Sequence, residues 1–372
     1  MLVGVPKEIK VHEYRVGLVP ASVRELVHRG HKVLVQKGAG LGIGFDDADY
    51  KAAGAQIAAT AKDVFAKAEM IVKVKEPQPA EIKMLRSDQT LFTYLHLAAD
   101  PDQTRGLMKA GTVSIAYETV TSARGGLPLL APMSEVAGRM AIQVGAHCLE
   151  KEPGGMGVLL GGVPGVAAGK VVILGGGVAG TNAARMAMGL EAHVVVIDKA
   201  IEKLYALDLQ FGSRLHTVFA TIDAIETHVL SADLVIGAVL VPGAAAPKLV
   251  TRDMVRRMKK GSVLVDISID QGGCFETSRP TTHADPTYIV DGVVHYCVAN
   301  MPGGVARTST FALNNATLPF VLALADKGYR KALADDVHLR AGLNVMGGRV
   351  TYKAVADVFR MKHTPAEEAL GL

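Results

Sequence analysis

The segment from Lys170 to Asp198, KVVILGGGVAGTNAARMAMGLEAHVVVID, constrains the fold more than any other part of the chain. It predicts a buried parallel strand, a turn through Gly175, Gly177 and Gly180, a helix, and a second apolar strand that ends at Asp198. Glycines at this spacing allow a tight turn, close approach of the backbone to a pyrophosphate, and close packing of helix on strand. The terminal acid, about 20 residues beyond, would accept hydrogen bonds from ribose hydroxyl groups.

Glycines also occur in ordinary turns, so the elements around this turn decide whether it indicates a nucleotide site or only a turn. Here the strand, turn, helix, second strand and terminal acid all occur in order, which favours a nucleotide site. A carboxylate at Asp198 repels a 2'-phosphate, so the segment predicts NAD and not NADP, although Lys199 weakens that inference.

A second α/β unit precedes the glycine turn and has no such turn of its own. Apolar runs at 2–5, 32–36, 70–74, 91–95 and 113–116 alternate with helical stretches, which is typical of a parallel sheet with helices on both faces. The 372 residues are enough for two or three domains. We therefore predict two doubly wound α/β domains, one a Rossmann domain and the other flavodoxin-like or Rossmann-like.

Polar residues follow the predicted strands of the first unit. Lys75 comes directly after the run 70–74, His96 directly after the run 91–95, and Arg15 lies in the loop after the first strand. Ligands bind beyond the carboxyl ends of strands in such sheets, so we expect the three side chains at one rim. Taken singly, Arg15 and Lys75 are equally well surface charges and His96 a structural histidine. Together, two cations suit a carboxylate and the imidazole suits proton transfer.

Two further polar residues have competing interpretations. Ser134 precedes apolar residues at helical spacing, so we expect it to cap a helix, and contact with a cofactor is the alternative. Asp270 follows the predicted strand 263–267, which places it either at the cofactor rim or, because QGG follows, in a cap or turn. Towards the carboxyl end we expect a helix over 313–327 with a kink at Pro319, packing on the first domain.

Composition and charge exclude several classes of protein. A net charge of +4 without a basic run argues against nucleic-acid and membrane-surface binding. Cys148, Cys274 and Cys297 are too widely spaced for a disulfide framework or a metal motif, so we predict no metal site. The start MLVGVPKEIK does not resemble a signal peptide and no stretch has the length of a membrane helix. A cytoplasmic location is the expectation.

Several motifs together closely resemble the bacterial alanine dehydrogenases. They are VPKEIKVHEYRVGLVP, the strand ends at Lys75 and His96, APMSEVAGRMA, LLGGVPGVAAGKVVILGGGVAG, SVLVDISIDQGG and NMPGGVARTSTFALNNATLP, and they span essentially the whole chain. The resemblance implies a substrate domain made of residues 1–129 plus 307–372, an NAD-binding Rossmann domain of residues 130–306 inserted within it, and a homohexamer. Gly304 and Ala306 depart from the family's usual larger residue and proline, which would loosen the loop that contains them.

The resemblance also implies roles for individual residues. Arg15 and Lys75 match the positions that bind the substrate carboxylate, His96 matches the acid/base, and Asp270 matches the second catalytic group. The positions that match cofactor contacts are Ser134, Gly175, Gly177, Val178, Ala179, Gly180, Asp198, Lys203, Ile267, Asp270, Asn300 and Met301.

The reaction implied is the reversible NAD-dependent oxidative deamination of L-alanine to pyruvate and ammonium. Hydride leaves the alpha carbon for the nicotinamide, and water then attacks the resulting imine, with His96 and Asp270 handling protons. Other interpretations remain open: the NAD-binding subunit of a proton-translocating transhydrogenase, a related lysine-forming dehydrogenase that uses a larger keto acid, or an NAD sensor without catalysis. Tyr94, Leu130 and Met133 are candidates for the wall of the substrate pocket, or for core.

Overall fold

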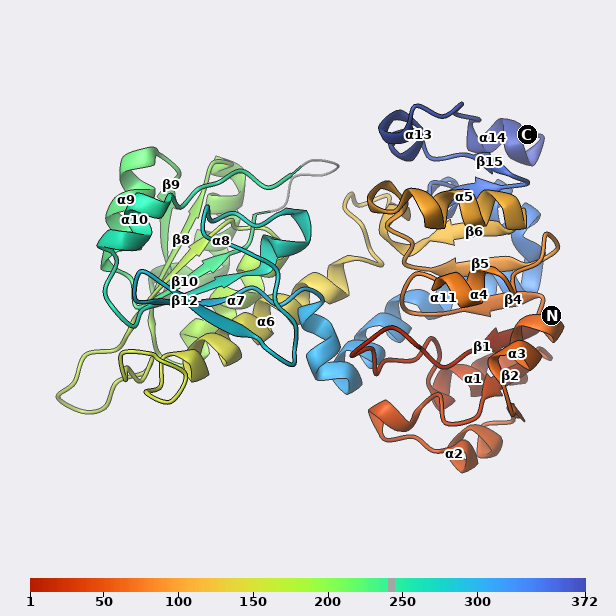
Figure 1. Ribbon diagram of the computed structural model, residues 1–372, viewed down its shortest axis with the longest axis horizontal. Helices are drawn as coiled ribbons and strands as arrows, with labels where there is room; N and C mark the ends of the chain where they lie inside the picture. Colours follow the sequence, from red (N-terminus) through yellow and green to blue (C-terminus); the bar gives the residue numbers. More distant parts are fainter. Residues whose placement is uncertain (240–244) are drawn as a thin grey trace. The chain divides into compact units, whose positions relative to one another are not determined.

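The computed structural model describes residues 1–239 and 245–372, which form two compact units (Figure 1). The first unit combines Met1–Met133 with Val305–Leu372, and the second is Ser134–Gly304. Each contains a largely parallel sheet with helices packed on it, so the prediction of two α/β domains is confirmed. Which unit binds substrate and which binds cofactor stays a prediction.

The sheet of the first unit has eight strands in the order β15-β14-β6-β5-β4-β1-β2-β3. Its parallel strands are β1 (Leu2–Val5), β2 (Lys32–Gln36), β3 (Gln56–Ala58), β4 (Met70–Val72), β5 (Thr90–Thr93) and β6 (Val113–Ala116). The strands β14 (Leu343–Met346) and β15 (Arg349–Val350) extend the sheet antiparallel beyond β6. Parallel strands that are covered on both faces are apolar throughout, and β4, with the sequence MIV, is wholly buried.

Helices of the first unit come from both ends of the chain. They are α1 (Pro20–His28), α2 (Asp47–Ala52), α3 (Ala61–Lys67), α4 (Pro79–Ile82), α5 (Pro101–Ala110), α11 (Ala306–Asp335), α12 (Val337–Arg340), α13 (Lys353–Phe359) and α14 (Ala366–Leu370), with short 3-10 turns η1 (Leu41–Ile43), η2 (Leu97–Ala99) and η3 (Tyr117–Thr119). The carboxyl-terminal part packs on this unit through a core cluster that contains Phe65, Leu107 and Val355.

The sheet of the second unit has seven strands in the order β12-β13-β11-β10-β7-β8-β9. They are β7 (Lys170–Leu174), β8 (His193–Asp198), β9 (His216–Phe219), β10 (Leu234–Gly237), β11 (Val263–Asp266), β12 (Thr287–Val290) and β13 (Val293–Tyr296). The helices are α6 (Ala131–Cys148), which begins three residues before the unit, α7 (Val178–Gly189), α8 (Ile201–Phe211), α9 (Ile222–Ser231) and α10 (Arg252–Arg257), with 3-10 turns η4 (Gly212–Arg214), η5 (Ile267–Gln271) and η6 (Met301–Val305).

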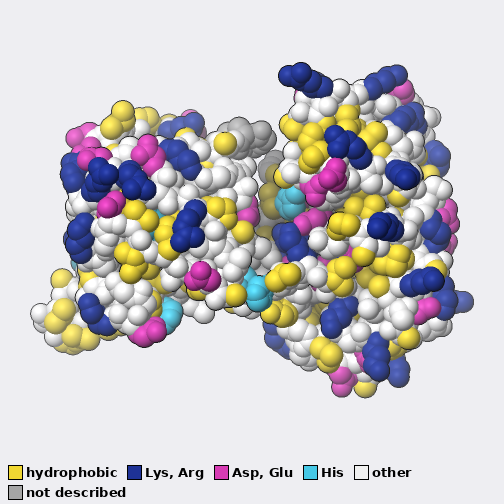
Figure 2. Space-filling model, in the orientation of Figure 1, with side chains coloured by type: hydrophobic (Ala, Val, Ile, Leu, Met, Phe, Trp, Pro, Cys, Tyr) yellow, Lys and Arg dark blue, Asp and Glu magenta, His cyan; other side chains and the backbone are white. Residues whose placement is uncertain are grey.

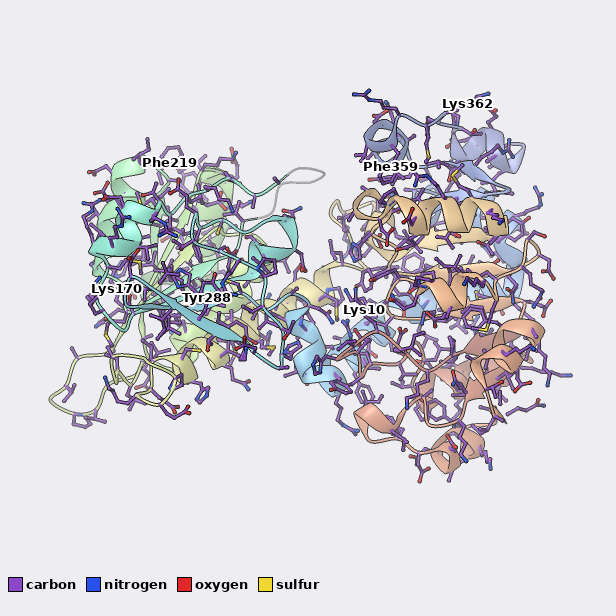
Figure 3. The ribbon with its side chains drawn as sticks, in the orientation of Figure 1. Lys10, Lys170, Phe219, Tyr288, Phe359 and Lys362 are labelled. Carbon is purple, nitrogen blue, oxygen red and sulfur yellow. The ribbon has the colours of Figure 1, made fainter. Side chains whose placement is uncertain are left out.

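Strand β12 pairs antiparallel with β13 at the edge of this sheet and was not predicted. The ring of Tyr288 in β12, labelled in Figure 3, stacks on His295 of β13 with centroids 4.9 Å apart. Arg279 lies over the same ring at 4.0 Å. These cross-strand contacts stabilise an edge strand that sequence periodicity alone does not reveal.

Several predicted boundaries were wrong. Strand β4 ends at Val72, so Lys73 and not Lys75 follows it directly, and β5 ends at Thr93, two residues before Leu95. Helix α11 already begins at Ala306, and its non-helical backbone lies at Gly328, with φ 70°, and not at Pro319. Glycine adopts this left-handed conformation at little cost, and it ends one helical stretch so that another can begin.

Candidate active site

The carboxyl ends of β1, β4 and β5 lie side by side, because these strands are neighbours in the first sheet. The loops that follow them carry Arg15, Lys75 and His96. Glu13 and Tyr94 connect the three: the charges of Arg15 and Lys75 both lower the pKa of Glu13, and Tyr94 interacts electrostatically with Arg15 while its ring stacks on that of His96. The structure therefore brings the three predicted residues of the first unit to one rim.

Arg15 is buried, and its guanidinium is held by the carboxylate of Glu13. Nε donates to Oε1 at 2.7 Å and Nη2 to Oε2 at 2.6 Å, while Nη1 lies 3.1 Å from the sulfur of Met133. Burial by itself raises the pKa of the Glu13 carboxyl, but the hydrogen bonds and charge of Arg15 hold it below its ordinary value. The two parallel hydrogen bonds to Glu13 fix the orientation of the Arg15 guanidinium.

Lys75 is anchored through its backbone. Glu8 accepts the N–H of Val74 at 2.7 Å and that of Lys75 at 3.4 Å, and the Thr93 hydroxyl donates to the Lys75 carbonyl at 2.9 Å. Lys73, the residue that follows β4 directly, is fully buried, and two carboxylates hold its ammonium. Its ammonium donates to Glu8 at 2.9 Å and to Glu81 at 2.8 Å.

His96 stands in a strained backbone conformation, with φ 50° and ψ 39°. The carboxylate of Glu118 accepts the N–H of His96 at 2.6 Å and that of Leu95 at 3.1 Å, and it lies 3.9 Å from Nδ1 of the imidazole. The ring stacks on Tyr94 with an interplanar angle of 9°, and its side chain is 45% exposed. A fixed and accessible imidazole is suited to proton transfer.

The glycine turn of the second unit has the geometry that close phosphate approach requires. Gly175 has φ 104°, and a Cβ at Gly180 would lie 1.8 Å from the Gly175 carbonyl oxygen. A Cβ at Gly177 would meet no described atom within 4 Å. Helix α7 starts after Gly177 without a side-chain cap among the described residues, and its first turn contains Val178, Ala179 and Gly180. Its N–H groups and dipole fit an anionic pyrophosphate.

Asp198 ends β8 beside that turn and is 8% exposed. Its Oδ2 accepts the Gly176 N–H at 2.7 Å and Lys203 at 3.3 Å, and its Oδ1 accepts the Ala200 N–H at 2.8 Å. Burial alone would raise the pKa of this carboxyl, but the two backbone donors and Lys203 hold that pKa below its ordinary value. Asp198 thus fixes the glycine turn, and it retains lone pairs that could accept from a ribose.

Ser134 does not cap a helix, because α6 begins at Ala131 and Ser134 lies inside it. The prediction placed the first helical residue at 135, four residues too late. Four residues on, a Cβ at Gly138 would lie 2.1 Å from the Ala179 carbonyl oxygen, so α6 touches the first turn of α7 at Gly138. Residues four apart share a helix face, so Ser134 lies on the face of α6 that contacts α7. This favours the alternative role in cofactor contact.

The remaining predicted residues follow β11 and β13 of the second unit. Ile267 and Asp270 lie in η5, where Asp270 is exposed. Asn300 has φ 62° and its carbonyl lies 3.1 Å from Nε2 of His283, while Met301 is buried at the start of η6. His96 belongs to the first unit and Asp270 to the second, so their joint action stays a prediction.

The pocket-wall candidates and the unusual Gly304 also have defined surroundings. Tyr94 is 3% exposed and donates to the Leu129 carbonyl at 2.5 Å, and the Met133 sulfur lies 3.1 Å from Nη1 of Arg15. A Cβ at Gly304 would lie 2.7 Å from the His283 ring and 2.9 Å from Met140. A larger residue at 304 therefore requires both side chains to shift.

Other surface features of the described residues do not add to this site. A cleft of about 800 Å³ runs along α4 and α5, and Arg15, Lys75 and His96 do not line it. Within residues 1–239 and 245–372, no cluster of histidine, cysteine or carboxylate side chains has the makings of a metal site, and no helix has the length and apolar character to cross a membrane. On the face drawn in Figure 2, basic and acidic side chains are interspersed over each unit.

Sequence reasoning missed Glu8, Glu13 and Glu118, which hydrogen-bond to the predicted residues Lys75, Arg15 and His96. Glu13 offered a weak signal, since a carboxylate two residues before an arginine can pair with it. Glu8 and Glu118 lie 67 and 22 residues from the backbone groups of Lys75 and His96 that they bind, and no local pattern indicates such pairs.

Comparison with known proteins extends over the whole chain. Two family models match, described as the alanine dehydrogenase/PNT N-terminal domain over residues 4–137 and C-terminal domain over residues 141–353. The alanine dehydrogenase of Halomonas elongata is 64% identical over 371 residues, covering 100% of both chains. A solved L-alanine dehydrogenase has a TM-score of 0.94 at 56% identity over 97% of this chain and 99% of its own. A transhydrogenase from Sinorhizobium meliloti has a TM-score of 0.82 at 26% identity over 94% of this chain and 100% of its own.

Proposed function

Because the chain belongs to the alanine dehydrogenase/PNT family, we propose that it catalyses the reversible NAD-dependent oxidative deamination of L-alanine to pyruvate and ammonium. One observation carries this function beyond the family name: Arg15, Lys75 and His96 meet at the carboxyl ends of three neighbouring strands. Two cations at one rim suit the carboxylate of a small amino acid. The accessible imidazole beside them suits the proton transfers that accompany loss of the amino group from the adjacent carbon.

In this proposal the residues of the first unit bind and orient the substrate. Arg15, fixed by Glu13, and Lys75, fixed by Glu8, hold the carboxylate so that the alpha carbon has one defined orientation. His96 takes a proton from the amine, or from the water that attacks the imine, and returns it in the reverse reaction. Asp270 of the second unit is the other proton-handling group. Tyr94 and Met133 pack against Arg15 and form part of the pocket wall.

NAD supplies the acceptor for the hydride that leaves the alpha carbon. The support for NAD is the open approach at Gly177, the uncapped start of α7 and the acid Asp198 at the end of β8. Ser134, Lys203, Ile267, Asn300 and Met301 are the further proposed contacts. A homohexamer and a cytoplasmic location also stay predictions, and the support for the hexamer is the family resemblance. Light scattering on the purified protein measures its assembled mass.

The test of the function follows NADH absorbance, first with NAD and L-alanine, then with NADH, pyruvate and ammonium. We expect turnover in both directions. His96→Ala is expected to reduce kcat by about a hundredfold or more while the Kd for NADH stays within about twofold of the parent. If His96→Ala keeps parental turnover, the assignment of His96 as the acid/base is wrong.

The NAD-binding subunit of a transhydrogenase is the second candidate, since one transhydrogenase has a similar fold over nearly the whole chain. Such a protein passes hydride to another nucleotide and binds no amino acid. L-alanine-dependent formation of NADH by the isolated protein would exclude it. A lack of turnover with L-alanine, together with NADH binding, would favour it or a sensor.

A further inference from the structure

A fully buried carboxylate stands at the carboxyl end of β11, four residues before Asp270. Asp266 is 0% exposed, and its strand is flanked by β10 and β13. Burial raises the pKa of this carboxyl, against which the hydrogen bonds from Ser278 and from the Cys274 backbone act. A buried carboxylate is retained only where its hydrogen bonds compensate for lost hydration, so its contacts indicate its role.

Those contacts join the two ends of one loop. Oδ1 accepts the Ser268 N–H at 3.0 Å, which makes Asp266 the cap of η5. Oδ2 accepts the Cys274 N–H at 2.9 Å and the Ser278 hydroxyl at 2.5 Å. The loop between these anchors, residues 267–274, carries Asp270 on its exposed part.

The glycines around Asp266 show that the loop is built close against the carboxylate. Gly272 and Gly273 have φ of 87° and 76°, and together they turn the chain back so that the Cys274 N–H reaches Asp266. A Cβ at Gly273 would lie 2.6 Å from Oδ2 of Asp266. On the outer side, Lys248 donates to the carbonyls of Gly272 and Gly273 at 2.6 and 2.8 Å. The path of the loop is thus set from both sides.

We propose that Asp266 is a positioning residue for Asp270, holding loop 267–274 in the shape that presents the Asp270 carboxylate for proton transfer. This inference rests on the proposed function, in which Asp270 is catalytic. Asp266 touches no reacting atom and acts through the loop alone. Removing its acceptors leaves the N–H groups of Ser268 and Cys274, the Ser278 hydroxyl and the Cys274 thiol without this partner, and the loop must rearrange to satisfy them.

The experiment compares Asp266→Ala, Asp266→Asn and a matched control, Asp233→Asn. Asp233 is 9% exposed and lies directly before β10, at the opposite end of the same sheet, where it accepts the Lys170 N–H at 2.8 Å and Lys259 at 2.7 Å. Each protein is assayed for kcat and for KM with L-alanine, with active sites counted by NADH titration. If Asp266 had a purely structural role, its substitution would only increase the number of unfolded molecules. Expressing kcat per NADH-binding site removes that effect.

For Asp266→Ala we expect kcat per NADH-binding site to fall about a hundredfold, with KM for L-alanine changing by less than about threefold. Asparagine keeps one oxygen acceptor for the Ser268 N–H, so Asp266→Asn is expected to retain about tenfold more activity than the alanine variant. Asp233→Asn is expected to lower Tm and to keep the parental kcat per site. If both Asp266 variants fail to fold, Ser278→Ala, which loses a single hydrogen bond, is expected to reduce kcat per site about threefold.

A parental kcat per site in the folded Asp266 variants, or in Ser278→Ala if they do not fold, overturns the positioning role. The proposed function fails separately, and only if the parent protein turns over no L-alanine.

Discussion

Glu118→Ala is expected to disable His96 while leaving cofactor binding intact. In the parent protein the carboxylate accepts the N–H groups of Leu95 and His96 and holds His96 in the left-handed conformation. Left-handed backbone stores about 1–2 kcal/mol at a residue with a side chain. That energy is released if the hydrogen bonds to Glu118 are lost, so the variant favours another conformation of the loop that contains His96.

The size of the effect follows from the two N–H groups. Leu95 is 0% exposed, so its N–H without an acceptor costs about 1–3 kcal/mol, whereas the N–H of half-exposed His96 can turn to water. Adding the backbone strain, about 2–5 kcal/mol favours rearrangement in the alanine variant. A displacement of the imidazole by about 1 Å is enough to reduce kcat about a hundredfold.

The assay measures kcat with L-alanine and the Kd for NADH on the same preparation. Glu118→Gln keeps an oxygen acceptor without the charge, so its kcat is expected to fall only about tenfold. Glu69→Ala is the matched control, since Glu69 also accepts a backbone N–H, that of Leu2 at 2.5 Å, but precedes β4 at the other end of the sheet. Parental kcat in Glu118→Ala, or a loss of NADH affinity equal to the loss of kcat, would refute the reasoning.

Four further predictions concern two glycines of the turn, Asp198 and the proposed substrate-binding residue Arg15. Gly180→Ala places a methyl group 1.8 Å from the Gly175 carbonyl oxygen and is expected to lower the free energy of unfolding in urea by about 3 kcal/mol. Gly177→Ala meets no described atom within 4 Å, so it should change that free energy by less than ~1 kcal/mol and weaken NADH binding in a fluorescence titration by at least ~1.4 kcal/mol. The pKa of Asp198 in the folded protein lies below its ordinary value, so the stabilisation by this carboxylate is present above the ordinary pKa and is lost as pH falls through the lower folded pKa. Asp198→Asn should therefore flatten the acid limb of the stability measured by urea unfolding below about pH 4. Arg15→Lys removes the bidentate contact with Glu13 that orients the side chain at position 15. It should raise KM for L-alanine about tenfold or more with an unchanged KM for NAD.

Sequence reasoning succeeded where the determinants are local. The glycine turn, helix α7 and the acid at the end of β8 lie within one continuous segment, and each step of that segment limits the next. Lys75 and His96 were found because strand ends are visible as the ends of apolar runs. Their distances from the true ends of β4 and β5 were misjudged by two residues each, since buried residues continue past Val72 to Val74 and past Thr93 to Leu95.

It failed where partners are distant in sequence. Strands β12, β14 and β15 are short, and their pairing energy comes from neighbours that local periodicity cannot identify. Ser134 looked like a cap because serine is a common cap, but helix α6 extends to Ala131. The carboxylates Glu118 and Asp266 bind backbone N–H groups that only the folded chain brings to them, so their roles became visible with the structure.

The pairing of β14 with β6 has a consequence for how the protein is made. Strand β6 ends at Ala116, but its outer neighbour is Leu343–Met346, which the ribosome adds only after the whole second unit. At ~5–20 residues per second, the edge of β6 waits roughly 10–45 s for that partner. During this interval the seven strands of the second unit have already emerged and can form their own sheet. The nascent chain can therefore complete the second unit while the sheet of the first unit still has an open edge, and that open edge is the surface that a chaperone would have to shield.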